Sequence, residues 1–284
     1  MRITPHIQVG RGEPGKVEIG SDSPLALIAG PCVIESEEHV RFLAAEIRRI
    51  AGPFIFKASF DKANRSSVSS YRGPGLNEGL RILKGVRDAG FPVLTDIHEP
   101  SQAAAAAESV DILQIPAFLC RQTDLLVEAG RTGRVVNIKK GQFVSPYDMR
   151  HAVDKVASTG NDRILLTERG SSFGYNNLVV DMRSLAIMCG FGCPVVFDAT
   201  HSVQLPGAAG DVSGGQPEFI EPLACAAVAA GADAVFVEVH ESPENALSDG
   251  KNALNLHLLS AFLHKLQRIH DAICTPTASA TSKL

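Results

Sequence analysis

Residues 112–138 read ILQIPAFLCRQTDLLVEAGRTGRVVNI, which has the pattern of one complete strand–helix–strand unit. The stretch begins with the short apolar run Ile112–Ile115 and ends with a second one, Val135–Ile138. Between them, Gln122–Ala129 has the apolar spacing of an amphipathic helix, and Gly130 follows where a glycine commonly ends a helix. Two apolar strands joined by a helix run parallel and are buried on both faces. The stretch therefore predicts a βαβ unit.

The same alternation recurs along most of the 284 residues. The other strand candidates are Leu25–Ala29, Phe54–Ala58, Val93–Ile97, Ile164–Thr167, Val195–Asp198 and Ala234–Val237. The other helix candidates are Glu37–Ile50, Asn77–Ala89, Asp148–Ser158, Glu221–Ala230 and Ala253–Ala272, with Gly90 and Gly231 placed to end two of them. About eight such units predict an α/β fold closed into a (β/α)₈ TIM barrel. No G-x-G-x-x-G follows the first strand, which argues against an open doubly wound sheet.

The two ends of the chain differ in composition from this repeating part. Residues 1–24 are rich in glycine and proline, and we expect a short extension there with a hairpin at Val17–Ile19 covering the lower end of the barrel. We expect the catalytic barrel to span residues 25–273. Residues 274–284 have the composition of a disordered tail.

Composition narrows the class of protein and its partners. Hydrophobic residues make up 45% and charged residues 20% of the chain, and the formal net charge is −4. That charge argues against nucleic acid as the main partner, because binding to phosphate backbones needs a basic face. No apolar run reaches the ~18 residues of a membrane span, and the N-terminus lacks the apolar core of a signal peptide. The six cysteines contain no CxxC pair. We therefore expect a cytoplasmic protein with free thiols and no membrane partner.

Nearly every predicted strand ends in a charged or hydrogen-bonding residue. Barrel active sites form at the carboxyl ends of the strands, so these side chains are expected to converge on one rim. They are Cys32, Lys57, Asp96, His98, Gln114, Lys139, Lys140, Glu168, Arg169, His201, Glu238 and His240. The basic residues among them, with Lys62 and Arg65 from the loop after the second strand, indicate an anionic substrate. The alternative is that they pair with Asp61, Asp96 and Glu168 in ion-pair networks.

A second set of residues has the donor atoms of a metal site. Cys32, His201, Glu238 and Asp249 offer one thiolate, one imidazole and two carboxylates, which suit Zn²⁺, Fe²⁺ or Mn²⁺. Taken singly, a cysteine or histidine near a strand end is more often a buried core residue. The residues alone leave both readings open.

Several motifs together carry a resemblance to a known family. From about Pro24 to Phe262 the chain resembles the 3-deoxy-D-manno-octulosonate-8-phosphate (Kdo-8-phosphate) synthases. The residues 62–67, Lys-Ala-Asn-Arg-Ser-Ser, are similar to the sugar loop of that family, whereas DAHP synthases typically carry Lys-Pro-Arg-Thr there. The matching segments are Ala29–Cys32, Phe56–Ser67, Thr95–Glu99, Leu113–Leu119, Asn137–Gln142, Thr167–Gly170 and Phe197–Ser202.

The resemblance implies a transferase that condenses phosphoenolpyruvate with D-arabinose 5-phosphate and water. The products are Kdo-8-phosphate, a precursor of the Kdo sugar of lipopolysaccharide, and inorganic phosphate. It further implies that Lys139, Arg169 and the backbone near Ala117 hold the phosphate of phosphoenolpyruvate. Its carboxylate and enol oxygen are expected to meet Lys57, Ser59, Lys62 and Gln114.

For the sugar phosphate, the resemblance implies Asn64, Arg65 and Ser66, with Arg65 and Ser66 reaching the site of a neighbouring subunit in a homotetramer. Asp96 and His98 are expected near the reacting carbons and the attacking water, and Lys57, Asp96, His98 and His201 are the expected catalytic residues. Metal-dependent members have Cys at the position of Cys32 and metal-independent members have Asn. The resemblance thus implies a divalent ion on Cys32, His201, Glu238 and Asp249.

Three other readings of the sequence stay open at this point. A related barrel synthase could use phosphoenolpyruvate with a different aldehyde, such as erythrose 4-phosphate. A Schiff-base aldolase could use Lys139 or Lys57 as its nucleophile. A barrel that only binds a phosphosugar, without catalysis, would also explain a basic rim.

Overall fold

The computed structural model describes residues 4–12, 15–65, 67–209 and 212–274. Within them, eight parallel strands close into a barrel in the order β11-β8-β7-β6-β5-β4-β3-β14, and β11 pairs with β14 to complete the ring. The predicted (β/α)₈ TIM barrel is therefore confirmed. The strands are β3 (Ala26–Gly30), β4 (Ile55–Lys57), β5 (Val93–Asp96), β6 (Ile112–Ile115), β7 (Val135–Lys139), β8 (Ile164–Glu168), β11 (Val195–Asp198) and β14 (Ala234–His240).

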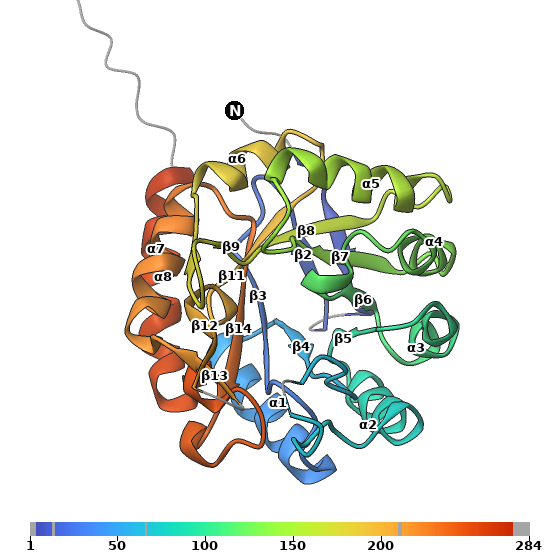
Figure 1. The fold of residues 1–284 in the computed structure, drawn as a ribbon, viewed down its shortest axis with the longest axis vertical. Helices are drawn as coiled ribbons and strands as arrows, with labels where there is room; N and C mark the ends of the chain where they lie inside the picture. The colour runs from blue at the N-terminus through green and yellow to red at the C-terminus, as the bar shows by residue number, and fades with distance from the viewer. Residues whose placement is uncertain (1–3, 13–14, 66, 210–211, 275–284) are drawn as a thin grey trace, which may run out of the picture.

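Helices form a ring around the strands (Figure 1). They pack their apolar faces onto the outer face of the barrel, where a large cluster of buried aliphatic and aromatic residues lies. No helix among the described residues is both long and apolar enough to cross a membrane. The helices are α1 (Glu37–Ala51), α2 (Leu76–Asp88), α3 (Ala103–Ser109), α4 (Thr123–Arg131), α5 (Met149–Ala157), α6 (Arg183–Cys189), α7 (Ile220–Ala229) and α8 (Leu259–Cys274).

The N-terminal hairpin is present. Strands β1 (Ile7–Val9) and β2 (Val17–Ile19) pair antiparallel, with Ile7 opposite Ile19. Their buried side chains belong to the same apolar cluster as the residues at the start of the barrel strands, such as Ile28 and Leu94. The hairpin thus closes the end of the barrel at which the strands begin.

Two helix boundaries differ from the sequence prediction. The expected helix at Ala253–Ala272 starts later, because β15 (Leu254–Asn255) first pairs with β14, and a 3₁₀ turn capped by Asn255 then leads into α8. Gly130 does not end its helix. It lies inside α4, where a Cβ atom would sit 2.7 Å from Thr159 Oγ1, so glycine is needed there for close packing. Gly90 and Gly231 follow helices with φ of +87° and +92°, as predicted.

Some elements were absent from the sequence prediction. They are α6, the hairpin of β9 (Ser171–Ser172) and β10 (Leu178–Val179), and the hairpin of β12 (Gln204–Ala209) and β13 (Val212–Gly215). Both hairpins follow barrel strands, β8 and β11 respectively, at the carboxyl end of the barrel. Residues of the tail beyond Cys274 lie outside the described part of the chain.

The inner face of the barrel changes character along each strand. Near the strand starts the inward side chains are apolar: Ile28, Ile55, Leu94, Ile112, Val135, Leu165, Val196 and Phe236. Two or four residues later, on the same face, the strands carry Lys57, Asp96, Gln114, Asn137, Lys139, Thr167, Asp198 and Glu238. Because side chains alternate between faces with a period of two, this pattern gives an apolar lower half and a polar mouth.

Candidate active site

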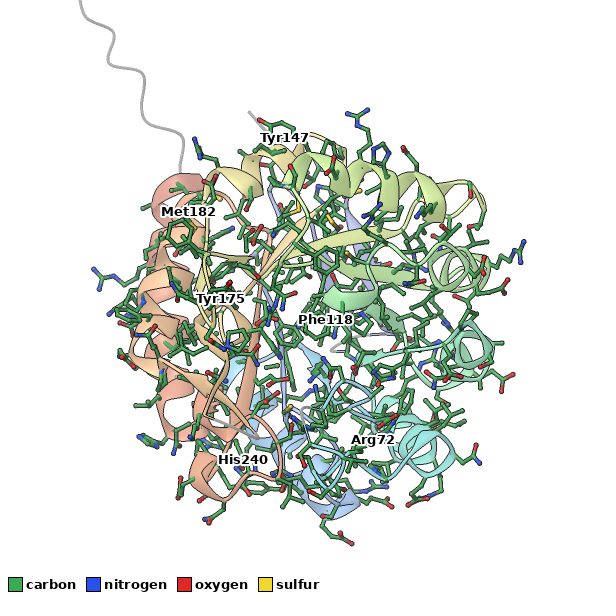
Figure 2. All side chains as sticks on the ribbon, viewed as in Figure 1. Arg72, Phe118, Tyr147, Tyr175, Met182 and His240 are labelled. Atoms are coloured by element: carbon green, nitrogen blue, oxygen red, sulfur yellow. The ribbon has the colours of Figure 1, made fainter. Side chains whose placement is uncertain are left out.

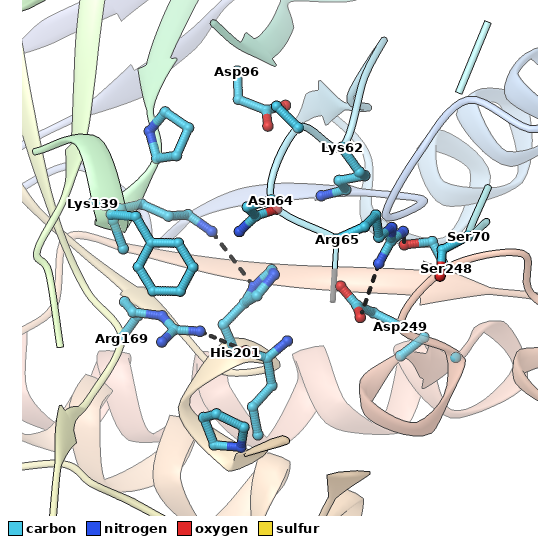
Figure 3. Close-up of a pocket in the computed structure, with 18 of the residues that line it drawn as sticks. Lys62, Asn64, Arg65, Ser70, Asp96, Lys139, Arg169, His201, Ser248 and Asp249 are labelled. Carbon is cyan, nitrogen blue, oxygen red and sulfur yellow. Dashed lines mark hydrogen bonds and ion pairs between the residues drawn. The ribbon is translucent and has the colours of Figure 1, made fainter. Parts of the chain in front are cut away.

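A cavity of about 1070 Å³ opens at the polar mouth of the barrel. Figure 3 shows that its charged side chains come from several strand ends and point toward one another. In the view of Figure 2, Phe118, which also lines the cavity, lies near the centre of the molecule. The residues selected from the sequence that line the cavity are Lys57, Lys62, Asn64, Arg65, Asp96, His98, Gln114, Ala117, Lys139, Arg169, His201 and Asp249.

Three of the selected residues do not line the cavity, and the structure does not describe a fourth. Cys32 and Glu238 are buried next to the cavity, where Lys57 contacts both: its Nζ lies 2.7 Å from Glu238 Oε1 and 2.7 Å from the Cys32 carbonyl oxygen. Ser59 is fully buried, and its hydroxyl has no hydrogen-bond partner. Ser66 lies outside the described residues.

One wall of the cavity is strongly cationic. The Lys139 ammonium donates to Asp198 Oδ2 and lies 3.9 Å from the centre of the Phe236 ring. Arg169 donates from Nη2 to Gln204 Oε1 at 2.6 Å, while its Nη1 is buried without a hydrogen-bond partner. A buried guanidinium nitrogen without an acceptor is costly, and a phosphate oxygen would satisfy it. This wall is therefore built to receive an anion.

Burial shifts the ionisation of these cations. It lowers the pKa of Lys139, and although the nearby Asp198 raises it, Lys57 lowers it again, so the net shift is downward. Burial likewise lowers the pKa of the Arg169 guanidinium. Both cations have given up hydration, which makes them gain more from an incoming anion than exposed cations would.

A chain of hydrogen bonds holds the floor of the cavity. Thr167 Oγ1 donates to Asn137 Oδ1 at 2.6 Å, and Asn137 Nδ2 donates to Gln114 Oε1 at 3.1 Å. All three side chains are buried and come from neighbouring strands. Because Gln114 accepts from Asn137 through its oxygen, its amide nitrogen remains free to donate into the cavity.

Asp96 and His98 form a pair on the opposite wall. His98 Nε2 lies 3.2 Å from Asp96 Oδ2, and both Asp96 Oδ1 and His98 Nδ1 are buried without a hydrogen-bond partner. Burial raises the pKa of Asp96, but Lys62, the hydrogen bond from His98 and the charge of Lys57 outweigh it. The pKa of Asp96 therefore lies well below its usual value. The pair offers an ionised carboxylate and an imidazole to whatever occupies the cavity.

The depressed pKa of Asp96 predicts an acid-dependent loss of stability. A group whose pKa is lower in the folded state stabilises the protein above its unfolded pKa, ~3.9, and this contribution fades as pH falls toward the folded value. We expect Asp96→Asn to be less stable than the wild type at pH 7 and this gap to narrow steadily below about pH 4. Urea unfolding at several pH values measures both. A gap that stays constant with pH would show that Asp96 is not ionised in the folded protein.

A cluster with metal-binding donors lies beside the cavity. The ligand atoms of Cys32, Glu238 and Asp249 all lie within 4.8 Å of one another. His201 lies beside this cluster and contacts one of its members, with 3.6 Å between His201 Nε2 and Glu238 Oε1. Its other ring nitrogen, Nδ1, lies 2.8 Å from Asp198 Oδ2. This arrangement leaves Nε2 directed at the cluster, as in carboxylate–histidine–metal sites.

The fit of these residues to a divalent cation depends on their donor atoms and surroundings. Glu238 Oε2 is buried and has no hydrogen-bond partner, so one carboxylate oxygen is available for a ligand bond. Burial raises the pKa of the Cys32 thiol and Glu238 raises it further, so Cys32 would become a thiolate ligand only with a cation beside it. Burial lowers the pKa of His201, which favours the neutral ring that binds metals. The set of one sulfur, one nitrogen and two carboxylates suits a borderline divalent ion.

The loop that carries Asn64 and Arg65 closes a third side of the cavity. Arg65 donates to Ser248 Oγ and, at 3.2 Å, to the carbonyl oxygen of Tyr71, and its Nη1 lies 3.5 Å from Asp249 Oδ1. Figure 3 shows Arg65 between this loop and the segment with Ser248 and Asp249. Arg65 thus presents its guanidinium to the cavity of its own chain.

Three strand-end residues expected at the rim do not line the cavity. Lys140 and Glu168 lie on the outward-facing register of β7 and β8, with Lys140 Nζ 3.5 Å from Glu168 Oε1. His240 lies beyond Glu238 on β14 and contacts Glu35 instead. The expectation that all strand-end residues converge was wrong for these three. The period-two alternation turns Lys140 and Glu168 away from the barrel axis, whereas His240 shares the register of Glu238 but lies two residues further along β14.

The structure also adds residues that the sequence reasoning did not select. Asp198 holds both Lys139 and His201, and Gln204 holds Arg169. Asp198 ends a predicted strand, so its position was the available signal. Gln204 begins β12 and Ser248 lies on an irregular segment, and nothing in their local sequence indicates the site.

The chain matches one protein family and is similar to several named proteins. Residues 6–275 match the DAHP synthetase I family. The chain is 63% identical over 278 residues to a 2-dehydro-3-deoxyphosphooctonate aldolase of Koribacter versatilis, covering 94% of this chain and 99% of the relative. Proteins of the same name from Syntrophotalea carbinolica and Geobacter sulfurreducens are 63% and 61% identical, covering 90% and 91% of this chain and 94% and 97% of theirs.

Proposed function

Since this chain belongs to the DAHP synthetase I family, we infer that its cavity condenses phosphoenolpyruvate with D-arabinose 5-phosphate and water. The products are Kdo-8-phosphate and inorganic phosphate, and the enzyme is a transferase of Kdo biosynthesis. The observation that carries this function is identity above 60%, over nearly the full length of both chains, to proteins named 2-dehydro-3-deoxyphosphooctonate aldolase. The cationic mouth of the barrel suits two phosphorylated substrates.

The phosphate of phosphoenolpyruvate is assigned to the cationic wall. Lys139 and Arg169 supply two buried cations there, and the segment at Ala117 lies on the same cavity. The carboxylate and enol oxygen are assigned to Lys57, Lys62 and Gln114, with Ser59 behind them. Holding both anionic groups fixes the methylene carbon of phosphoenolpyruvate in one position, and such alignment contributes roughly 7–11 kcal/mol in intramolecular analogies.

The reaction then forms one carbon–carbon bond and one carbon–oxygen bond, the latter from water, breaks the carbon–oxygen bond to phosphate, and places a proton on the former aldehyde oxygen. The methylene carbon attacks the sugar aldehyde, positive charge develops at the enol carbon, and water adds there. The resulting tetrahedral intermediate expels phosphate by carbon–oxygen cleavage. Asp96 and His98 are assigned to orient the water and accept its proton, since Asp96 is ionised and His98 contacts it. Lys139 and Arg169 stabilise the phosphate as its charge grows.

A divalent ion, Zn²⁺, Fe²⁺ or Mn²⁺, is assigned to Cys32, His201, Glu238 and Asp249. When bound, it would supply electrophilic polarisation or positioning of the sugar near its aldehyde. Asp198 orients His201 for this role through Nδ1, and Lys57 donates to Glu238 Oε1, which leaves Oε2 for the ion. Among the four, the mutual approach of Cys32, Glu238 and Asp249 supports the assignment most directly.

The phosphate of the sugar is assigned to Asn64, Arg65 and Ser66. Replacing Arg65 with alanine is expected to raise KM for D-arabinose 5-phosphate about ten- to 150-fold, since a charge-assisted hydrogen bond contributes roughly 1.5–3 kcal/mol. KM for phosphoenolpyruvate should change much less. Steady-state kinetics with each substrate varied in turn measures the two values.

The matched control for this prediction is Arg72→Ala. Arg72 lies in the same loop, but it pairs with Asp61 at 2.6 Å and does not line the cavity. Its replacement should leave both KM values close to those of the wild type. Equal increases for the two substrates in Arg65→Ala would contradict the assignment of the loop to the sugar phosphate.

A phosphate-release assay tests the function itself. With phosphoenolpyruvate present, D-arabinose 5-phosphate should support turnover and erythrose 4-phosphate should support little or none. Preference for the shorter sugar would instead identify a synthase with another aldehyde. Treatment with borohydride during turnover should leave the protein mass unchanged, because a trapped adduct on Lys57 or Lys139 would indicate a Schiff-base aldolase.

We further propose that the enzyme acts in the cytoplasm as a homotetramer. Support comes from large exposed aromatic side chains on segments that follow the barrel strands, including Phe143, Tyr147, Phe173 and Tyr175, which are 61% to 98% exposed. Exposed aromatic surface of this kind commonly marks a subunit interface. Light scattering coupled to gel filtration measures the mass of the assembly.

A further inference from the structure

A second group of histidine and glutamate side chains lies outside the catalytic cavity. Glu35 precedes α1, His39 lies in its first turn, and His240 is the last residue of β14. Their ligand atoms all lie within 4.8 Å of one another. We call these three residues the outer histidine cluster. None of them lines the cavity, and Figure 2 shows His240 toward the lower edge of the molecule, away from Phe118 at the mouth.

The outer histidine cluster contains buried nitrogen atoms without hydrogen-bond partners. His240 is 5% exposed, and its Nε2 has no hydrogen-bond partner, although Glu35 Oε1 lies 3.4 Å away. His39 Nδ1 is also buried and unpartnered, while its Nε2 contacts Glu241 Oε2 at 2.9 Å. Buried polar atoms are almost always satisfied in native proteins. Two such atoms in one small cluster indicate a ligand.

The charge of the cluster indicates what kind of ligand it is. In the described part of the chain, neither Glu35 nor Glu241 forms an ion pair with a lysine or arginine; their charged partners are His39 and His240. Neutral imidazoles would leave the half-buried Glu35 and the more exposed Glu241 without a counter-charge. Two imidazoles and a carboxylate are a common ligand set of Zn²⁺ and related ions. A divalent cation would balance the charge and use the unpartnered nitrogens.

One hydrogen bond opposes this ligand and must be broken. The Ser242 amide donates to His240 Nδ1 at 3.0 Å, which places the proton of the neutral ring on Nε2. A cation on Nε2 requires that proton to move to Nδ1, so the Ser242 amide must turn away. Ser242 is only half-buried, and water can replace the lost acceptor. Cation binding therefore costs one hydrogen bond within the protein, and a hydrogen bond from the Ser242 amide to water replaces it.

We propose that Glu35, His39 and His240 form a second divalent-cation site with a structural role. It would join the start of α1 to the end of β14. Glu35 Oε1 also accepts from the Leu247 amide at 2.9 Å, which leaves its other oxygen for the cation. The segment after Leu247 carries Ser248 and Asp249, which line the catalytic cavity. A cation in the outer histidine cluster thus steadies the loop that completes one side of the active site.

Metal binding to the chelator-stripped full-length chain tests this proposal. Equilibrium dialysis against Zn²⁺ should give two ions per wild-type chain and one in His39→Gln. Co²⁺ spectra separate the sites, because only a site with Cys32 gives thiolate-to-cobalt charge-transfer absorption. In Cys32→Ser that band should vanish, while the weaker visible bands of a thiolate-free site remain. Those bands should then disappear in the double variant Cys32→Ser, His39→Gln.

Two further variants serve as a second test and as a control. Glu35→Gln keeps the shape of the side chain and should weaken the second ion at least tenfold, so a folding defect in His39→Gln would not decide the result. His151→Gln, at an exposed histidine on α5, should still bind two ions. The proposal is overturned if the wild type binds a single ion that carries the thiolate band. It is equally overturned if both His39→Gln and Glu35→Gln, correctly folded by circular dichroism, bind as many ions as the wild type.

Discussion

Lys139→Met is expected to lower kcat by about 100- to 1,000-fold, the loss typical of removing one preorganised donor from a developing anion. Lys139 points into the cavity from the end of β7 and is held by Asp198. Its ammonium is buried, so water does not compete with substrate for it. Methionine keeps the unbranched shape and most of the length of the side chain and removes the ammonium group. Single-turnover phosphate release with saturating substrates measures the effect.

The neighbouring residue provides a matched control. Lys140 is equally buried, and its Nζ lies 3.1 Å from the Gly170 carbonyl oxygen and 3.5 Å from Glu168 Oε1, outside the cavity. Lys140→Met also breaks a buried ion pair, which typically costs about 3–5 kcal/mol of stability. We expect it to keep kcat within about tenfold of the wild type once the folded fraction is counted. Equal losses in both variants would mean that Lys139 acts only through stability.

Removal of the metal is the second prediction with a large effect. A strong chelator is expected to lower kcat at least about 100-fold, and adding back a divalent ion should restore it, since a bound cation contributes several kcal/mol of charge stabilisation. The physical basis is the buried Glu238 Oε2, which has no hydrogen-bond partner, together with the close approach of the ligand atoms of Cys32, Glu238 and Asp249. Phosphate release with and without chelator, beside metal analysis of the same samples, measures this.

Cys32→Asn separates positioning from electrophilic chemistry. If the ion mainly positions the sugar, an asparagine amide can take over part of that role, and the variant should keep measurable activity that chelator does not change. Cys32 Sγ lies 2.7 Å from Ser248 Oγ, a distance at which an amide can also hydrogen-bond. A folded but inactive Cys32→Asn protein would show instead that the ion is needed for its charge.

Local sequence was sufficient for the barrel and for most of its mouth. Short buried strands, amphipathic helices and their order determine a parallel sheet, and the number of units determines its closure. Residues that end a strand on the inward register, such as Lys57, Gln114 and Lys139, were identified because the carboxyl ends of parallel strands meet at one rim. The barrel and the inward-facing strand-end residues could both be predicted because helices repeat every 3.6 residues and strands every 2. These periods are visible in short stretches of sequence.

Only the tertiary structure decided which strand-end residues face inward and which partners they meet. Lys140 and Glu168 turn outward because strand ends vary by a residue, and a one-residue change reverses the face. The partner of Arg169 is Gln204, at the start of β12, and the partner of Arg65 is Ser248, 183 positions along the chain. The outer histidine cluster likewise joins residues about 200 positions apart. Such contacts form only when packed helices and strands bring side chains from distant parts of the chain together. A local sequence pattern does not show which distant residues will meet.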